Sequence, residues 1–416
     1  MSNDKWLNKK ISRRDMLKLT GVGIAGAAIG ASGLGGVMKA MGHDIFEVVS
    51  DSTTAENKVN FYGKRQSGIT TPVQQHIYFA SLNVLFTTKK ELQELLQQWT
   101  PFIVRLTNGE MVGESTTNNR VPTVDTGEAE GLDASNLTIT IGVGPSLFKK
   151  LNIEHLKPAE LEDLPHFSKD QLQSELTGGD LCIQACADDP QVAFHAVRNL
   201  VRAASGKVEV HWSQAGFNSF PAGGGTPRNL FAFKDGTANP VLTDEKTLNE
   251  VVWCDKGWMK NGSYLVVRLI QMHLETWDRT SLKDQEKTFG RHRDSGAPLG
   301  KTDEFADFDV EEKDINGEYI IPEVSHVHLA KKAGVQMLRR SFSYASGVIG
   351  KTGTHDAGLL FISFQKDPSQ FIAVQNSLGR KDKMNEYITH RGSALFACFP
   401  GVKEGGYLGE TLFNAL

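Results

Sequence analysis

The chain has 416 residues, of which 39% are hydrophobic and 23% are charged, and its formal net charge is −4. A chain of this length is long enough for two domains, and its composition is that of a globular protein rather than of a disordered or fibrous one. The small negative charge gives no reason to expect a nucleic acid or an anionic membrane surface as a partner.

The first forty residues have the pattern of an export signal. Arg13 and Arg14 precede a weakly apolar run, rich in Gly and Ala, from Leu19 to about Met38. A twin arginine before such a run is typical of the Tat pathway, which carries folded proteins, often with their cofactor loaded. We therefore predict a Tat signal over residues 1–40 and a secreted or cell-envelope protein. An uncleaved anchor is the alternative, since the run is almost long enough to span a membrane, but it is too rich in Gly to make a good transmembrane helix. The polar residues 41–67 are predicted to be a flexible linker.

The next part of the chain alternates between strand and helix patterns. Strands are predicted at residues 75–86, 136–143, 179–187 and 207–214, and helices at residues 88–106 and 190–204. Leu92, Leu95, Leu96 and Trp99 share one face of the first helix. The order β-α-β-β-α-β is that of a ferredoxin-like fold, so residues 68–220 are predicted to form an N-terminal ferredoxin-like domain.

The remaining residues repeat this rhythm. Strands are predicted at residues 262–273, 357–365 and 392–398, with a helix at 274–289 and another that starts at residue 370. A Gly- and Pro-rich stretch at residues 221–227 separates the two parts. The predicted fold class is therefore α+β, with two tandem ferredoxin-like domains and antiparallel sheets, and residues 221–416 form the C-terminal one.

Four cysteines in an exported chain raise the question of disulfides. Cys182 and Cys186 lie four residues apart in one predicted strand, which separates them by about 13 Å and prevents a bond between them. Cys254 and Cys398 remain as partners for each other, but we favour buried free thiols.

Asp235 lies in the stretch Phe231-Ala232-Phe233-Lys234-Asp235-Gly236. Asp-Gly is common in ordinary turns, because Asp bonds to nearby backbone and Gly accepts a positive φ. Here two phenylalanines flank the turn and Arg228 precedes it. A carboxylate in such surroundings would be partly desolvated and able to exchange a proton with a bound ligand.

A second candidate segment, residues 324–329, contains His326 and His328 among apolar residues. If this segment is extended, both imidazoles point to the same side and could bind zinc or copper, although no carboxylate or cysteine follows at ligand spacing. Arg339 and Arg340 come next and are adjacent. In a strand they face opposite sides, so that one can face a pocket while the other reaches solvent or a carboxylate.

A carboxylate on a turn, a histidine and an arginine are the three groups that a haem peroxidase needs. In this order they resemble the dye-decolorizing (DyP-type) peroxidase family, in particular its exported branch of Efe-type deferrochelatase/peroxidases, over roughly residues 65–416. The resemblance implies two ferredoxin-like domains with one haem b per chain in the C-terminal domain. The family signature Gly-x-x-Asp-Gly has Ala232 in place of its first glycine here, and the turn is strained if that position needs a positive φ.

The resemblance also implies roles for individual residues. Asp235 would be the acid–base catalyst and Arg339 the distal arginine that contacts the haem, while His326 would be the proximal ligand of the haem iron. Asp382 would accept a hydrogen bond from His326 and make it a stronger ligand. Gly236, Thr237, Ala238 and Asn239 would border the haem. His328 remains unassigned.

The function that follows is peroxide-dependent oxidation of a second, unknown reducing substrate. The family branch further implies release of iron from haem with protoporphyrin left intact, other components of an Efe-type iron uptake system as partners, and the option of a homo-oligomer. Two alternatives stay open. A haem carrier without catalysis would need His326 but not Asp235 or Arg339, and a transition-metal protein would use His326 and His328.

Overall fold

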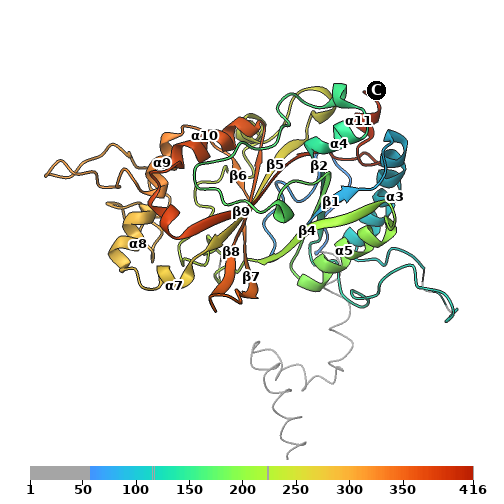
Figure 1. Ribbon diagram of the computed structural model, residues 1–416, viewed down its shortest axis with the longest axis horizontal. Coiled ribbons are helices and arrows are strands. Elements are labelled where there is room, and N and C mark those ends of the chain that lie inside the picture. Colours follow the sequence, from blue (N-terminus) through green and yellow to red (C-terminus); the bar gives the residue numbers. More distant parts are fainter. Residues whose placement is uncertain (1–56, 115, 117, 223, 416) are drawn as a thin grey trace, which may run out of the picture. The chain divides into compact units, whose positions relative to one another are not determined.

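The computed structural model describes residues 57–114, 116, 118–222 and 224–415 (Figure 1). The predicted Tat signal and residues 41–56 of the predicted linker lie outside the described residues. The described residues belong to one compact unit, Asn57–Leu416. None of the helices in these ranges combines the length and the apolar character that a membrane crossing requires.

The first half of this unit has the predicted ferredoxin-like order of elements. Its elements are β1 (His76–Val84), α3 (Lys89–Thr107), β2 (Thr138–Val143), α4 (Pro145–Lys150), β3 (Leu181–Ala187), α5 (Pro190–Ala203) and β4 (Val208–Phe217). The strands pair antiparallel in the order β4-β1-β3-β2. A hydrogen bond joins helices α3 and α5: Trp99 Nε1 on α3 donates to Leu200 O on α5 at 2.9 Å.

The predicted apolar face of α3 is confirmed. Leu92, Leu95, Leu96 and Trp99 are all fully buried. Each such side chain stabilises the folded state by roughly 2 kcal/mol relative to an exposed one. The face belongs to a core that also contains apolar residues of β2 and β3.

The second half repeats the order after the short helix α6 (Glu245–Val251). Its elements are β5 (Ser263–Met272), α7 (Leu274–Trp277), α8 (Leu282–Phe289), α9 (His326–Lys332), β6 (Leu338–Arg339), β7 (Phe342–Val348), β8 (His355–Gln365), α10 (Pro368–Leu378), β9 (Ile388–Cys398) and α11 (Glu410–Phe413). The central strands pair antiparallel in the order β9-β5-β8, with β6 and β7 both beside β8.

One predicted helix of this half is wrong. Residues 274–289 form two helices, α7 and α8, rather than one. The break has a local cause, because the Ser281 hydroxyl accepts a hydrogen bond from the Asp284 backbone N–H and thus begins a new helix.

The two halves share one nine-stranded sheet. β2 pairs with β9 through Gly142 and Cys398, and β4 pairs with β7 through Phe217 and Ser343. Because β5 also pairs with β8, the strand pairings form a closed ring. The two ferredoxin-like sheets are thus joined at both of their edges, which fixes the second half, and the side chains it carries, against the first.

The end of the predicted linker belongs to the folded unit. Phe61 and Gln66 are buried, and the Gln66 side-chain amide donates hydrogen bonds of 2.9 Å to Ile141 O and Phe399 O. Tyr62 and Arg65 form isolated bridges to the segment after β9. The linker prediction is therefore wrong for these residues, because Phe61 is buried and the Gln66 side chain and two backbone bridges bind the segment to the sheet.

The four cysteines are free and buried, as we favoured. Cys182 and Cys186 lie on β3. Cys254 does not bond to Cys398, and its thiol donates to Lys366 O instead. Burial raises the pKa of the Cys254 thiol to about 12, so that this group stays protonated and unreactive at neutral pH.

Candidate functional site

Asp235 lies on a turn whose backbone the sequence only partly explains. The Asp235 N–H donates to Pro227 O at 2.9 Å, and Arg228 and Lys234 form a short antiparallel bridge. Gly236 has φ +114°, a conformation that favours glycine. Ala232 has φ +67°, so it occupies the left-handed region in which a side chain costs about 1–2 kcal/mol. The expected strain at the missing glycine of the family signature is therefore present.

The two phenylalanines beside the turn anchor it in the core. Phe233 stacks on Phe289 with ring centroids 3.9 Å apart, and Phe231 packs on Trp277 at 4.4 Å. Trp277 also donates its indole N–H to Phe231 O. These rings hold the base of the turn, while the Asp235 side chain remains 21% exposed. The carboxylate is therefore partly desolvated, as expected.

Arg339 faces Asp235 across the site. Its Nη1 lies 3.3 Å from Asp235 Oδ1. The Asn239 side-chain amide donates to Arg339 O at 2.7 Å and accepts from Arg339 N at 3.0 Å, so that it takes the place of a neighbouring strand beside β6. Asn239 therefore fixes the backbone from which the arginine reaches the carboxylate.

Arg340 has a different environment. It is buried, and its guanidinium donates to Thr71 O, to Pro72 O and to the Gln74 side chain. Thus only one of the two adjacent arginines pairs with a carboxylate at the site. Arg340 binds two backbone carbonyls and the Gln74 side chain, and not the solvent or carboxylate that the sequence suggested.

A cavity of about 270 Å³ lies beside this ion pair. Four of the predicted site residues line it: Asp235, Gly236, Asn239 and Arg339. Phe220 and Phe305 also contribute to the lining and are 41% and 69% exposed. Thr237 and Ala238 are not among the lining residues. The cavity thus combines one carboxylate with three arginines, Arg339 among them, and with apolar side chains.

His326 pairs with Asp382, as the sequence led us to expect. It is the first residue of α9, and its Nδ1 lies 2.7 Å from Asp382 Oδ2. The Asp382 side chain is 3% exposed and also accepts from Met384 N at 2.9 Å. His326 is 32% exposed, and its Nε2 makes no hydrogen bond to any residue that the structure describes. One ring nitrogen is therefore fixed and the other is available.

The charges around His326 connect it to the cavity. Burial alone would lower the pKa of His326, but the negative charge and hydrogen bond of Asp382, with a contribution from Asp235, raise it above its usual value. Arg339 acts in the opposite direction. His326 itself does not line the cavity, yet Asp235 and Arg339 are both close enough to affect it.

His328 does not join His326. The segment is the helix α9 rather than a strand, because the Ser325 hydroxyl caps it through His328 N. Residues two apart on a helix lie about 200° apart around its axis, so the expectation that both imidazoles point the same way is wrong. His328 is buried, with its Nδ1 3.2 Å from Ile321 O. A metal site built on this pair is thus excluded by its geometry.

Glu304 is a residue of the site that no sequence motif predicted. Its side chain is 8% exposed and accepts hydrogen bonds from Thr226, Lys234 and Thr237, on both sides of Asp235. Burial would raise the pKa of Glu304, but Lys234 and the two hydroxyls lower it below the usual 4.5. Glu304 is one of many acidic residues between residues 303 and 323, so no local signal distinguished it.

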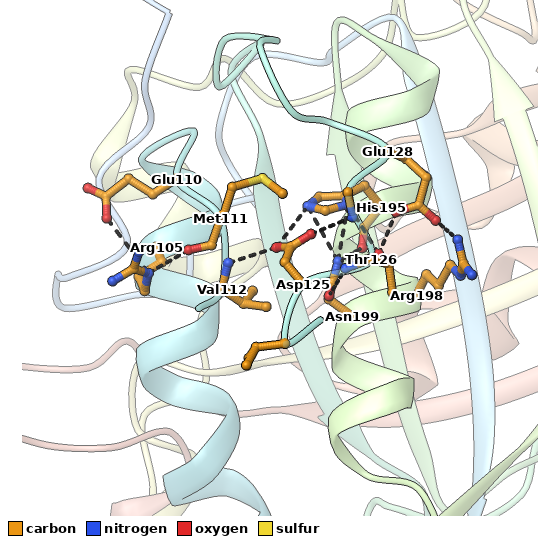
Figure 2. Close-up of polar contacts among 12 residues, drawn as sticks. Arg105, Glu110, Met111, Val112, Asp125, Thr126, Glu128, His195, Arg198 and Asn199 are labelled. Carbon is orange, nitrogen blue, oxygen red and sulfur yellow. Dashed lines mark hydrogen bonds and ion pairs between the residues drawn. The ribbon is translucent and has the colours of Figure 1, made fainter. Parts of the chain in front are cut away.

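A second histidine–carboxylate cluster lies in the first half (Figure 2). His195 on α5 has Nδ1 3.0 Å from Glu128 Oε2 and Nε2 3.5 Å from Asp125 Oδ2. Asp125 also accepts from Val112 N and Gly127 N. The His195 side chain is only 3% exposed. This cluster therefore ties the connection before β2 to α5 and leaves no ring nitrogen for a ligand.

Two family models match the chain. The model for the Dyp-type peroxidase N-terminal part matches residues 66–218, and the model for the C-terminal part matches residues 226–403.

Curated relatives match over most of their length. A Yersinia pestis protein named deferrochelatase is 35% identical over 410 residues, which cover 94% of this chain and 93% of that protein. The deferrochelatase of Escherichia coli strain UTI89 is 38% identical over 375 residues, which cover 86% of this chain and 88% of that protein.

Solved structures are similar as well. Ferric DtpA from Streptomyces lividans has a TM-score of 0.80 and 37% identity, over 87% of this chain and 99% of that one. A DyP-type peroxidase from Cellulomonas bogoriensis has a TM-score of 0.76 and 34% identity, over 85% and 98% of the two chains.

Proposed function

Because the chain belongs to the Dyp-type peroxidase family, we propose that it binds haem b and reduces hydrogen peroxide while it oxidises a second substrate. The observation that carries this proposal is the Asp235–Arg339 pair, 3.3 Å apart and lining a cavity, with the His326–Asp382 pair close enough to be affected by both charges. A carrier would need the histidine alone.

The side chains fit a haem group. His326 offers one free imidazole nitrogen, while Asp382 holds the other, which is the usual arrangement for a histidine that binds a metal. His326 would thus hold the haem iron, and Gly236, Asn239 and Arg339 would contact the haem from the cavity. Thr237 and Ala238 would border it as backbone neighbours of Gly236. The similar DtpA structure is described as ferric.

Bound haem would supply the redox-active iron for cleavage of the peroxide O–O bond. Asp235 would move the proton. Its Oδ1 faces Arg339, which leaves Oδ2 to take the proton from one peroxide oxygen and return it to the other. Arg339 would stabilise the negative charge on the departing oxygen.

The test uses Asp235→Asn and Arg339→Leu. Proton transfer by a placed carboxylate is typically worth about 10² to 10⁴ in rate, so each variant should keep its haem and react with peroxide at least tenfold more slowly in stopped flow. The two losses should not add, because Arg339 acts through the charge on Asp235. Wild-type rates in both haem-bound variants would favour the carrier.

A matched control is available in the same half of the molecule. Asp356 pairs with Arg391 at 2.7 Å, and the two side chains are 26% and 20% exposed, much like Asp235 and Arg339. Neither lines the cavity. Asp356→Asn should therefore react with peroxide at the wild-type rate.

We also propose release of iron from haem, because the relatives at 35–38% identity over most of the chain are named deferrochelatase. Removal of iron from an intact ring requires protons for the pyrrole nitrogens, and Asp235 is the acid in the cavity that can supply them. Haem incubated with the protein under reducing, peroxide-free conditions should give fluorescent metal-free protoporphyrin, more slowly with Asp235→Asn. Intact haem or a ring-opened product would contradict this second activity.

Export is proposed through Arg13 and Arg14. Replacement of both by lysine keeps the charge but should block the Tat pathway. Undiminished secretion of that variant would show that another route exports the protein. If export and iron release both hold, the protein would act in iron acquisition, beside other components of an Efe-type uptake system.

A further inference from the structure

Glu304 is a buried carboxylate to which the proposed mechanism gives no part. It lies in the long connection between α8 and α9, more than sixty residues from Asp235 in sequence. Its Oε1 accepts hydrogen bonds from the hydroxyls of Thr226 and Thr237, and its Oε2 accepts from Lys234 Nζ. All of these donors belong to the segment 226–237, which carries Asp235.

The donors lie on both sides of the catalytic carboxylate. Lys234 directly precedes Asp235, and Thr237 follows two residues later, with its hydroxyl 2.9 Å from Glu304. The connection also approaches the turn at Gly296, where an added Cβ would lie 2.6 Å from the Lys234 side chain. Glu304 therefore holds the turn on either side of Asp235.

Glu304 is itself held in place. Arg291 Nη1 donates to Glu304 O at 3.0 Å and to Gly296 O at 2.6 Å. A carboxylate on a tethered backbone can fix the position of the groups that bind it, whereas one on a free loop would follow them.

The turn needs an external support. Ala232 is held at φ +67°, and a strained backbone persists only where the surroundings over-determine it. Other contacts hold the start of the turn: the Asp235 N–H bond to Pro227 O, the bridge between Arg228 and Lys234, and the Arg228 guanidinium, which donates to Ala232 O and Asp294 O at 2.7 Å each. Without Glu304, the turn could relax away from the geometry that sets Asp235 opposite Arg339.

The charge of Glu304 also favours the pairing of Asp235 with Arg339. Glu304 neutralises Lys234, whose backbone is adjacent to that of Asp235. If Glu304 lost its charge, the Lys234 ammonium would be free to compete with Arg339 for the Asp235 carboxylate.

We propose that Glu304 is the positioning residue of the catalytic turn: it holds Thr226, Lys234 and Thr237 so that Asp235 meets Arg339 and not Lys234. This inference rests on the proposed function for its catalytic consequence. The structural part, the restraint that Glu304 places on both sides of Asp235, is independent of it.

The structural part is tested on haem-free protein by amide hydrogen exchange of a peptide that spans residues 228–239. Glu304→Gln should exchange there at least tenfold faster than wild type. Glu312→Gln is the matched control, because Glu312 lies in the same connection and pairs with Lys301 at 3.0 Å near the surface. Its exchange should match wild type. Glu304→Asp, which keeps the charge but shortens the side chain, serves as a second variant if Glu304→Gln does not fold.

The catalytic part is tested on haem-loaded protein. Glu304→Gln should keep its haem and react with peroxide about tenfold more slowly, and Lys234→Met in that background should restore much of the rate, since it removes the competing ammonium. A merely structural defect would not be restored by a second substitution. A wild-type protein without peroxide reactivity would refute the proposed function and leave the exchange result standing.

Two results would overturn the proposal. One is exchange and peroxide rates within twofold of wild type in both Glu304 variants. The other is a slow Glu304→Gln whose rate Lys234→Met leaves unchanged, because Glu304 would then act through something other than the partner of Asp235.

Discussion

The two halves of the molecule repeat one fold, and each contains a histidine beside a buried carboxylate, Asp125 in the first half and Asp382 in the second. In the first half, the His195 side chain is 3% exposed and both of its ring nitrogens face carboxylates (Figure 2). In the second half, His326 is 32% exposed and only Nδ1 is engaged, by Asp382. The two histidines thus differ in which ring nitrogens have a partner among the described residues: both nitrogens of His195 face carboxylates, whereas Nε2 of His326 has no hydrogen-bond partner.

The pKa values of the two histidines are shifted in opposite directions. Burial lowers the pKa of His195 below 6.5, and Asp125 only partly offsets it. For His326 the effect of burial is outweighed by Asp382, and the pKa is raised. The first ring is thus less basic than a free imidazole and the second is more basic, as expected for a ring that a carboxylate supports.

The largest expected effect comes from Asp382→Asn, which weakens the pair that His326 forms with Asp382. The amide can still accept a hydrogen bond from His326, but it carries no charge. Loss of such a carboxylate partner typically costs about 10- to 100-fold in metal affinity, so haem should bind that much more weakly in an absorption titration. Asp356→Asn should bind haem as wild type does, and an equal loss in that control would mean that the effect is general.

The cluster of His195 with Asp125 and Glu128 is tested by His195→Ala, which should reduce the stability of the protein and leave haem binding unchanged. Removal of the ring leaves Asp125 and Glu128 short of a partner, which costs about 2 kcal/mol in the free energy of unfolding at neutral pH. Chemical denaturation measures this value. A variant that loses haem but keeps its stability would reverse the assignment of the two histidines.

The difference in the free energy of unfolding between wild type and His195→Ala should depend on pH, with a definite sign. Because the pKa of His195 is lowered in the folded state, the unfolded chain takes up a proton first as the pH falls below 6.5, and wild type is destabilised. The variant lacks this group. The stability difference should therefore be full above pH 6.5 and shrink as the pH falls through the folded-state pKa.

The sequence predicted the fold from periodic patterns, and it predicted the site from short motifs. The face of α3 and the order of strands follow from the spacing of Leu92, Leu95 and Trp99 and of similar runs. His326 failed as a strand residue because the Ser325 cap decided the local conformation. Glu304 could not be found, since its donors lie about seventy residues away and only the tertiary fold joins them.

The smallest expected effect concerns the strained turn. Ala232→Gly removes a side chain from a residue at φ +67° and should stabilise the protein by about 1 kcal/mol. Ala215→Gly is the control, because Ala215 lies exposed on β4, where glycine weakens a strand. A gain in both variants, or a loss in Ala232→Gly, would contradict the strain at the turn.

The central claim is that the open histidine of the second half binds haem and the closed one of the first half does not. The most direct test is a haem titration of the haem-free protein, followed by the Soret band, for wild type, His326→Ala, His195→Ala and His328→Ala. We predict one haem per chain and the same spectrum in all but His326→Ala, whose Soret band should shift or disappear. An unchanged spectrum for His326→Ala, or a loss of haem in His328→Ala or His195→Ala, would contradict the claim.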